Sequence, residues 1–219
     1  IKGKSQFRYE TNVGAALPIV ETVKNLMNSG DKIIKIEGVL SGTLSYIFNS
    51  LKEGKKFSDV VIDAKKRGYT EPDPRDDLSG LDIARKLLIL IRETGVNIEL
   101  SDIQIENLVP QKLRKIKNIN EFLSKLVEYD NDFESMRLKA KKNNKVLSYI
   151  AKYEKGRGTV KVEVIDADHP FYNLNGIDNI AAFTTQYYKE SPLVIKGPGA
   201  GPVFTASGVL SDILKIANS

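Results

Sequence analysis

The sequence predicts an α+β domain in which helices cover a mixed, largely antiparallel sheet. Helical and strand-like segments stand in blocks along the chain, an order that favours an α+β fold. Two strand-like stretches, residues 146–153 and 159–165, are joined by a Lys-Gly-Arg-Gly turn, as in an antiparallel pair. Hydrophobic residues make up 41% of the 219 residues, which is enough to form a buried core and argues against wholesale disorder.

The first half of the chain is mainly helical. The spacing of its apolar residues, every three or four positions in some stretches and alternating in another, defines these elements. Helices are predicted over residues 13–27, 44–51, 58–68 and 81–91, and a strand over residues 32–40. Gly30 and Gly68 are expected to end the first and third helices. Ser58 and Ser79 are expected to cap the third and fourth.

The remaining segments are shorter. Residues 70–80, TEPDPRDDLSG, contain two prolines and a glycine and therefore predict a loop. Residues 101–110 predict a short strand or loop. Helices are further predicted over residues 122–129, 133–140 and 203–217, and strands over residues 180–185 and 193–196.

The composition excludes several classes of function. The chain has no Cys, which excludes disulfide scaffolds, zinc held by Cys and thiol catalysis. Its single histidine, His169, excludes a metal centre built from several imidazoles. No apolar run is long enough to span a bilayer, and we see no signal or transit pattern. These observations predict a cytoplasmic protein that does not bind membranes.

The net charge of +5 comes from 33 basic and 28 acidic residues. The basic residues form short clusters diluted by acids, whereas nucleic-acid binders typically show a concentrated stripe with interleaved aromatic residues. No nucleic-acid partner is therefore expected.

The most informative segment combines acids with a stiff backbone. Five acids fall within residues 71–82: Glu71, Asp73, Asp76, Asp77 and Asp82. A loop stiffened by prolines at the start of a helix holds carboxylates in fixed positions, where they can bind an ammonium group. Asp82 and Lys86 are neighbours on one helix face, so a charged Lys86 can donate a proton to a developing alkoxide.

These acids and Lys86 are expected to surround one small cavity: Glu71, Asp77, Asp82 and Lys86. The alternative is an exposed salt bridge beside a charged turn, with the pair worth at most about 1 kcal/mol.

Two glycine-containing segments are further candidates. GPGAG, residues 197–201, lets a ligand approach the backbone at a helix start, although too few residues follow it for an independent dinucleotide-binding unit. A plain turn is the alternative there. In SGTLSYIFN, residues 41–49, the amides and hydroxyl of Gly42 and Thr43 suit a carboxylate, and ordinary N-capping by Ser41 is the alternative.

A cation site is the last candidate. In YETNVGAALP, residues 9–18, carbonyls released by a turn at Gly14 can coordinate a hard cation, with Glu10 as a further oxygen donor. The alternative is a tight entry into the following helix.

Five segments, in this order, resemble homoserine dehydrogenase, and most closely its short fungal type. They are YETNVGAALP, IEGVLSGTLSYIFN, FSDVV, AKKRGYTEPDPRDDLSGLDIARKLLIL and GAGPVFTASGVLSDILKIA. The resemblance runs across essentially the whole chain, and GYTEPDPRDDLSGLDIARK is very specific. The resemblance implies an oxidoreductase that interconverts L-aspartate 4-semialdehyde and L-homoserine with NAD(P)H, in the biosynthesis of threonine, methionine and isoleucine.

The resemblance also implies roles for individual residues. Lys86 would give and take the proton at the reacting oxygen, assisted by Asp82. The substrate would be held by Glu71, Asp77, Asp82, Thr43, Tyr69 and Gly42. The cofactor would lie beside Gly68 and Gly201. A sodium site would be built mainly from main-chain carbonyls at Glu10, Val13, Ala15 and Leu17.

The domain organisation follows from the same resemblance. Residues 1–200 would form a substrate-binding and dimerisation domain, and residues 201–219 a helix that completes a Rossmann domain lying outside this chain. A homodimer is expected, with sheets pairing across the interface, and the chain alone is expected to be inactive. The alternative is a non-catalytic module that dimerises and binds small amino acids or a cation.

Overall fold

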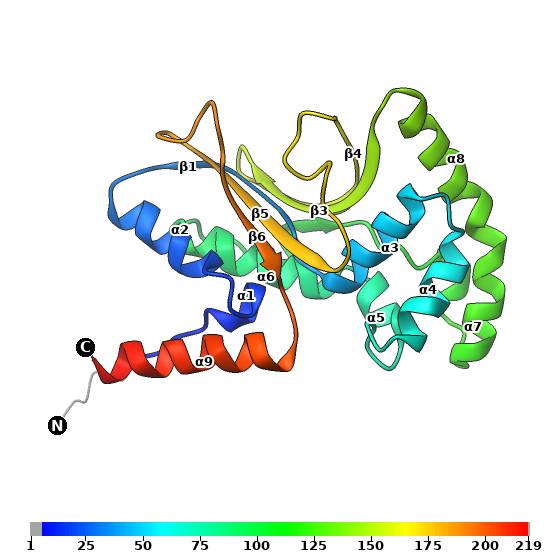
Figure 1. The fold of residues 1–219 in the computed structure, drawn as a ribbon, viewed down its shortest axis with the longest axis horizontal. Coiled ribbons are helices and arrows are strands. Elements are labelled where there is room, and N and C mark those ends of the chain that lie inside the picture. Colours follow the sequence, from blue (N-terminus) through cyan, green and yellow to red (C-terminus); the bar gives the residue numbers. More distant parts are fainter. Residues whose placement is uncertain (1–5, 219) are drawn as a thin grey trace.

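The computed structural model describes residues 6–218 and has one six-stranded sheet, in the order β2-β4-β3-β1-β5-β6 (Figure 1). The strands are β1 (Ile33–Val39), β2 (Ile103–Ile105), β3 (Val146–Glu154), β4 (Arg157–Ile165), β5 (Asp178–Thr185) and β6 (Leu193–Pro198). β2 runs parallel to β4, and the other neighbouring strands are antiparallel. The predicted α+β class with a mixed sheet is confirmed. Residues 1–5 and 219, at the outer ends of the two predicted domains, lie outside the described residues.

Helices pack along one face of this sheet and continue beyond its edge (Figure 1). They are α1 (Thr11–Gly14), α2 (Ile19–Asn28), α3 (Gly42–Lys52), α4 (Phe57–Lys66), α5 (Pro74–Leu78), α6 (Leu81–Glu93), α7 (Ile119–Lys125), α8 (Asp130–Lys142) and α9 (Pro202–Ala217). Short 3₁₀ turns occur at Leu100–Asp102, Gln111–Leu113 and Leu126–Tyr129. Within residues 6–218, the structure contains no helix with both the length and the apolar character needed to cross a membrane.

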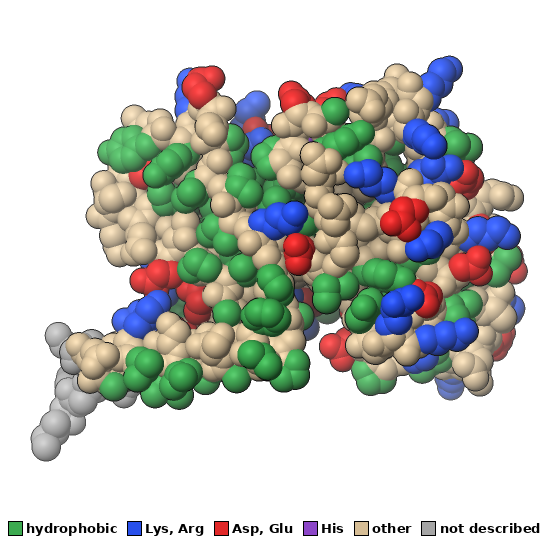
Figure 2. Space-filling model, viewed as in Figure 1, with side chains coloured by type: hydrophobic (Ala, Val, Ile, Leu, Met, Phe, Trp, Pro, Cys, Tyr) green, Lys and Arg blue, Asp and Glu red, His purple; other side chains and the backbone are tan. Residues whose placement is uncertain are grey.

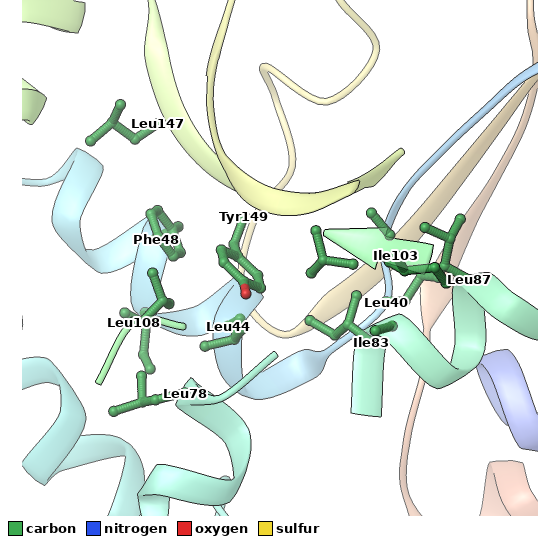
Figure 3. Packing of buried hydrophobic residues seen from close by; sticks show 14 of the residues in the cluster. Leu40, Leu44, Phe48, Leu78, Ile83, Leu87, Ile103, Leu108, Leu147 and Tyr149 are labelled. Carbon is green, nitrogen blue, oxygen red and sulfur yellow. The ribbon is translucent and has the colours of Figure 1, made fainter. Parts of the chain in front are cut away.

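The main core lies between the sheet and helices α3 and α6. Figure 3 shows Tyr149 of β3 among side chains of both helices, including Phe48 and Ile83. The Tyr149 ring is buried, and its hydroxyl donates a hydrogen bond of 2.5 Å to the Glu106 carbonyl. Gly80, which precedes α6, has a φ of +74°, and a Cβ there would lie 2.1 Å from the Tyr149 hydroxyl. The start of α6 therefore rests directly on the sheet.

The predicted helix over residues 13–27 is wrong as a single element, because α1 and α2 are separate. Pro18 precedes α2, and Ala15 takes a φ of +53°, which is unusual for a residue other than glycine. The Glu10 carboxylate accepts hydrogen bonds of 2.8 Å from the amides of Val20 and Glu21, so it caps α2 from outside. The helical spacing of apolar residues continues across the break, so the sequence pattern does not show it.

The predicted loop over residues 70–80 is corrected as well, since it contains α5. Pro74 occupies the first helical turn, where its missing N–H costs nothing, and the Asp73 carboxylate accepts from the Arg75 amide. The cap of α6 falls on Gly80 instead of Ser79, although the Ser79 hydroxyl accepts from the Leu81 amide at 3.2 Å.

The predicted cap of α4 is also wrong. α4 begins at Phe57, and Ser58 is a donor, with its amide and hydroxyl each 2.8 Å from a carboxylate oxygen of Asp130. Ser58 and Asp130 are both buried. Asp130, at the start of α8, therefore ties the two helices together.

Replacing Asp130 tests this link. Asp130→Ala is expected to lower the free energy of unfolding by about 2 kcal/mol, because two buried donors lose their charged acceptor. Urea unfolding followed by circular dichroism measures the change. Asp132→Ala, at an exposed position of the same helix, is the control and should cost less than about 1 kcal/mol. Equal losses in the two variants would contradict the role of Asp130.

The second face of the sheet carries a buried charge. Glu37 of β1 is 5% exposed, and its carboxylate lies 2.6 Å from Lys35 Nζ, 3.6 Å from His169 Nε2 and 3.7 Å from Lys152 Nζ. Burial raises the pKa of Glu37, but hydrogen bonds from His169 and Lys35 outweigh it and hold the pKa at about 2. Phe171 and neighbouring apolar residues of the loop after β4 cover part of this face.

Candidate functional site

Lys86 is fixed at the centre of the candidate site. Its ammonium donates a hydrogen bond of 2.9 Å to the Leu40 carbonyl at the end of β1, and lies 2.8 Å from the Asp82 carboxylate one turn earlier on α6. The Lys86 side chain is 19% exposed, whereas that of Asp82 is 65% exposed. An ammonium has three N–H donors, so these two partners leave one donor for a ligand. The helical pairing of Asp82 with Lys86 is confirmed.

Asp77, the second charged group, stands at the end of α5. Its carboxylate accepts a hydrogen bond of 2.8 Å from the Glu71 amide and lies 3.0 Å from the Thr43 hydroxyl. Burial raises the pKa of the Asp77 carboxyl, against the effect of these two hydrogen bonds. The Thr43 hydroxyl also hydrogen-bonds the Tyr69 carbonyl. Thr43, Asp77 and Tyr69 are therefore brought together as predicted.

The connection between β1 and α3 joins the two charged groups. Leu40, at its start, accepts from Lys86, and Thr43, just after it, contacts Asp77. Gly42, between them, approaches another part of the chain closely, since a Cβ there would lie 3.2 Å from the Ile177 carbonyl. The Ser41 hydroxyl accepts from the Leu44 amide, so the expected N-cap is present beside the site. Lys86 and Asp77 thus contact the two ends of one short connection.

Two of the predicted acids face outward. Glu71 and Asp82 are exposed, and Glu71 reaches Asp77 through its main-chain amide. Within residues 6–218, no hydrogen bond or ion pair links Lys86 or Asp82 directly to Asp77 or Glu71. A single cavity shared by all four side chains stays a prediction.

Gly68 and Tyr69 follow α4. Gly68 has a φ of +72° and its amide donates to the Lys65 carbonyl at 3.1 Å, so it ends α4 as expected. A Cβ at Gly68 would meet nothing within 4 Å, which leaves its backbone open to a ligand. The Tyr69 ring is partly exposed and meets the Tyr46 ring edge-on, with centroids 5.1 Å apart.

In the predicted cation loop, residues 9–18, the Glu10 carboxylate already accepts two hydrogen bonds from main-chain amides. Glu10 caps α2, and burial raises the pKa of its carboxyl. The Leu17 carbonyl accepts from the Ile19 amide at 2.8 Å, and Val13 is buried. In the described part of the chain, no group of three or more acidic or histidine side chains is placed to hold a metal. A cation here would therefore depend on main-chain carbonyls, including that of Ala15 in its unusual conformation.

The glycine loop, residues 197–201, passes over the buried side-chain amide of Asn179. A Cβ at Gly199 would lie 1.9 Å from Asn179 Nδ2, so only glycine can pass there. Gly201 has a φ of +121° and immediately precedes α9. Asn179 itself is fully buried, and among residues 6–218 neither its Nδ2 nor its Oδ1 has a hydrogen-bond partner. Nothing in the local sequence pattern singled out this residue.

Most of the apolar surface of α9 is exposed. Figure 2 shows hydrophobic side chains in green along this helix, and the exposed ones are Val203, Phe204, Val209, Leu210, Ile213, Leu214 and Ile216. The opposite side of α9 packs on α1, where a Cβ at Gly208 would lie 2.9 Å from the Ala15 carbonyl. The Asp212 carboxylate accepts from the Glu10 amide at 3.1 Å and fixes this contact.

The chain is similar to several known proteins. The family model described as homoserine dehydrogenase matches residues 18–214. A homoserine dehydrogenase of Schizosaccharomyces pombe is 50% identical over 216 residues, covering 95% of this chain and 57% of the relative. A chloroplastic bifunctional aspartokinase/homoserine dehydrogenase of Zea mays is 49% identical over 216 residues, covering 98% of this chain and 24% of the relative. The chain thus spans only part of the length of these relatives.

Solved structures show the same fold. A Candida auris protein of unknown function superimposes with a TM-score of 0.92 at 47% identity, covering 96% of this chain and 60% of that one. A hyperthermophilic archaeal homoserine dehydrogenase in complex with NADPH has a TM-score of 0.68 at 25% identity, covering 94% and 54%. Since the family model spans most of the sequence, the chain belongs to the homoserine dehydrogenase family.

Proposed function

We propose that the protein interconverts L-homoserine and L-aspartate 4-semialdehyde with NAD(P)H, and that this chain supplies the substrate-binding part. The observation that carries the proposal is Lys86, whose ammonium is held by the Leu40 carbonyl and Asp82 and keeps one N–H free. Relatives named homoserine dehydrogenase support the same reaction.

In this reaction the nicotinamide, when bound, supplies the hydride that reduces the aldehyde carbon. Lys86 Nζ gives a proton to the oxygen of the resulting alkoxide, and in the oxidation it takes that proton back from the hydroxyl. Asp82 orients the ammonium through their 2.8 Å ion pair. Because negative charge appears on the oxygen only near the transition state, a fixed ammonium there stabilises the transition state more than the ground state.

The substrate ammonium belongs with the acids of the same site. Asp77 is half-buried and rigidly held by the Glu71 amide, and the Glu71 carboxylate is exposed beside it. Thr43, Tyr69 and Gly42 form the neighbouring wall. Two carboxylates next to an open backbone at Gly68 suit a small zwitterionic amino acid.

The cofactor is proposed to lie between this site and the glycine loop, beside Gly68 and Gly201. The exposed apolar residues of α9 support the proposal that residues 201–219 complete a nucleotide-binding domain, because such a surface on a single helix is normally covered. Residues 1–200 then form the substrate-binding and dimerisation domain.

A sodium ion and a homodimer complete the proposal. The conformation of Ala15 supports the ion, since a non-glycine residue at positive φ persists only where its surroundings hold it. The homodimer, with sheets pairing across the interface, is proposed from the resemblance in sequence. The cytoplasmic location stays a prediction from the sequence.

The reaction is tested by mixing the full-length protein with L-aspartate 4-semialdehyde and NADPH. We expect loss of NADPH absorbance at 340 nm that depends on the aldehyde. Binding of L-homoserine without any NADPH oxidation would contradict the proposed reaction and favour a non-catalytic ligand-binding module.

A further inference from the structure

Asn179, at the start of β5, is a buried amide without partners. Its residue is fully buried, and within the described chain both of its side-chain polar atoms lack hydrogen bonds. Burying a donor and an acceptor unpaired destabilises a fold, and such groups are rare in native structures. Asn179 therefore calls for a partner that the chain itself does not provide.

The neighbours of Asn179 come from the segments that form the candidate site. The antiparallel pairing of Val39 with Ile180 brings Asn179 alongside Leu40, whose carbonyl holds the Lys86 ammonium. Because strand side chains alternate, Asn179 shares the face of Ala181 and Phe183, which belong to the main core below the helices.

The other neighbours of Asn179 belong to the glycine loop. On its second side, Asn179 pairs with Gly197, and a Cβ at Gly197 would lie 3.1 Å from the Leu17 side chain. Gly199 covers the amide itself. Asn179 thus lies between the support of the reacting lysine and the loop assigned to the cofactor.

The proposed reaction also involves an amide group. In a nicotinamide ring, the carbon that gives the hydride is bonded to the ring carbon that carries a carboxamide. A ring that delivers hydride to an aldehyde beside Lys86 therefore brings its carboxamide close to the end of β1. Two carboxamides pair through two hydrogen bonds, since each has an N–H donor and a C=O acceptor.

We propose that Asn179 binds the carboxamide of the nicotinamide through paired amide hydrogen bonds, an inference that rests on the proposed function. Because Gly199 lies against the amide, this binding requires the loop of residues 197–201 to move away from Asn179. Asn179 is then a cofactor-binding residue, kept unpaired in the free protein at a cost in stability.

The first test measures stability in the full-length protein without ligand. Asn179→Leu has a similar size and removes both unpaired groups, so the folding equilibrium constant is expected to rise about tenfold in urea unfolding. If Asn179 instead holds a buried structural water, the same change lowers that constant. This lowering would overturn the proposal.

The second test measures binding, by fluorescence titration, of NADPH and of its 3-acetylpyridine analogue, in which a methyl group replaces the amide nitrogen. The parent is expected to prefer NADPH, and Asn179→Leu to lose about tenfold of that preference, the worth of one hydrogen bond. Asn179→Ala provides a second variant, and Thr184→Val, on the same strand, is the control that should keep the parent's preference. An unchanged preference in both Asn179 variants would overturn the inference.

The two proposals fail in different ways. Full-length protein that binds NADPH with an Asn179-dependent preference, yet does not oxidise it with the semialdehyde, contradicts the reaction and retains the binding site. Active protein whose preference is independent of Asn179 contradicts only the inference. Absence of NADPH binding by the parent contradicts both.

Discussion

Lys86→Ala is expected to lower kcat of the full-length protein by about 10³-fold in both directions, within the range for loss of a positioned proton donor. The KM for L-homoserine should change little, because Asp77 and Glu71, the proposed partners of the substrate ammonium, lie outside the Lys86–Asp82 pair. Initial rates with L-homoserine and NADP, and with the semialdehyde and NADPH, measure both quantities. The expected loss is in kcat because the Lys86 ammonium contributes mainly when the substrate alkoxide forms.

Two further variants sharpen the Lys86 prediction. Lys86→Arg keeps the charge but cannot release a proton near neutral pH, so it should not restore kcat. Arg85→Ala, at the exposed neighbouring position of α6, is the control and should behave as the parent. A Lys86→Ala protein with the parent's kcat would contradict the assigned role.

The stability of the fold is expected to depend on pH through Glu37. Its folded pKa is lowered from 4.5 to about 2, so the stabilisation is fully present above the ordinary pKa and is lost as the pH falls through the folded one. A difference of this size corresponds to about 3 kcal/mol in the free energy of unfolding. Between pH 5 and pH 2, the parent should therefore lose about 3 kcal/mol more than Glu37→Gln.

Urea unfolding at a series of pH values measures this difference. Glu154→Gln is the matched control, since Glu154 lies near the end of β3 and is paired at 3.5 Å with Lys152, but its side chain is 37% exposed. It should keep the pH dependence of the parent. Parallel curves for the parent and Glu37→Gln would show that Glu37 is not the responsible group.

Local patterns predicted the elements whose signals lie within a few residues. The apolar stripe over residues 81–91 became α6, because an amphipathic helix shows its period directly. The glycine turn between β3 and β4 likewise fixed their pairing. The break at Pro18 was missed because apolar spacing continues through it, and α5 was missed because a proline that starts a helix resembles one that ends it.

In the candidate site too, local contacts could be predicted from the sequence and long-range contacts could not. The pairing of Asp82 with Lys86 follows from helical spacing alone. The second partner of Lys86, the Leu40 carbonyl, is 46 residues away in sequence and depends on how the helix crosses the strand. Asn179 had no local signal at all, because what distinguishes it is burial without partners, which only the packed chain reveals.

The contact between Gly80 and Tyr149 has a consequence for altering this protein. Lys86, to which we assign the proton transfer, lies less than two helical turns after Gly80, which rests on the Tyr149 hydroxyl. The position of the Lys86 side chain therefore depends on a buried contact beneath α6. Changes at Tyr149 should therefore disturb turnover without meeting any ligand. Attempts to broaden substrate choice are best directed at the exposed wall around Tyr69, with this buried support left intact.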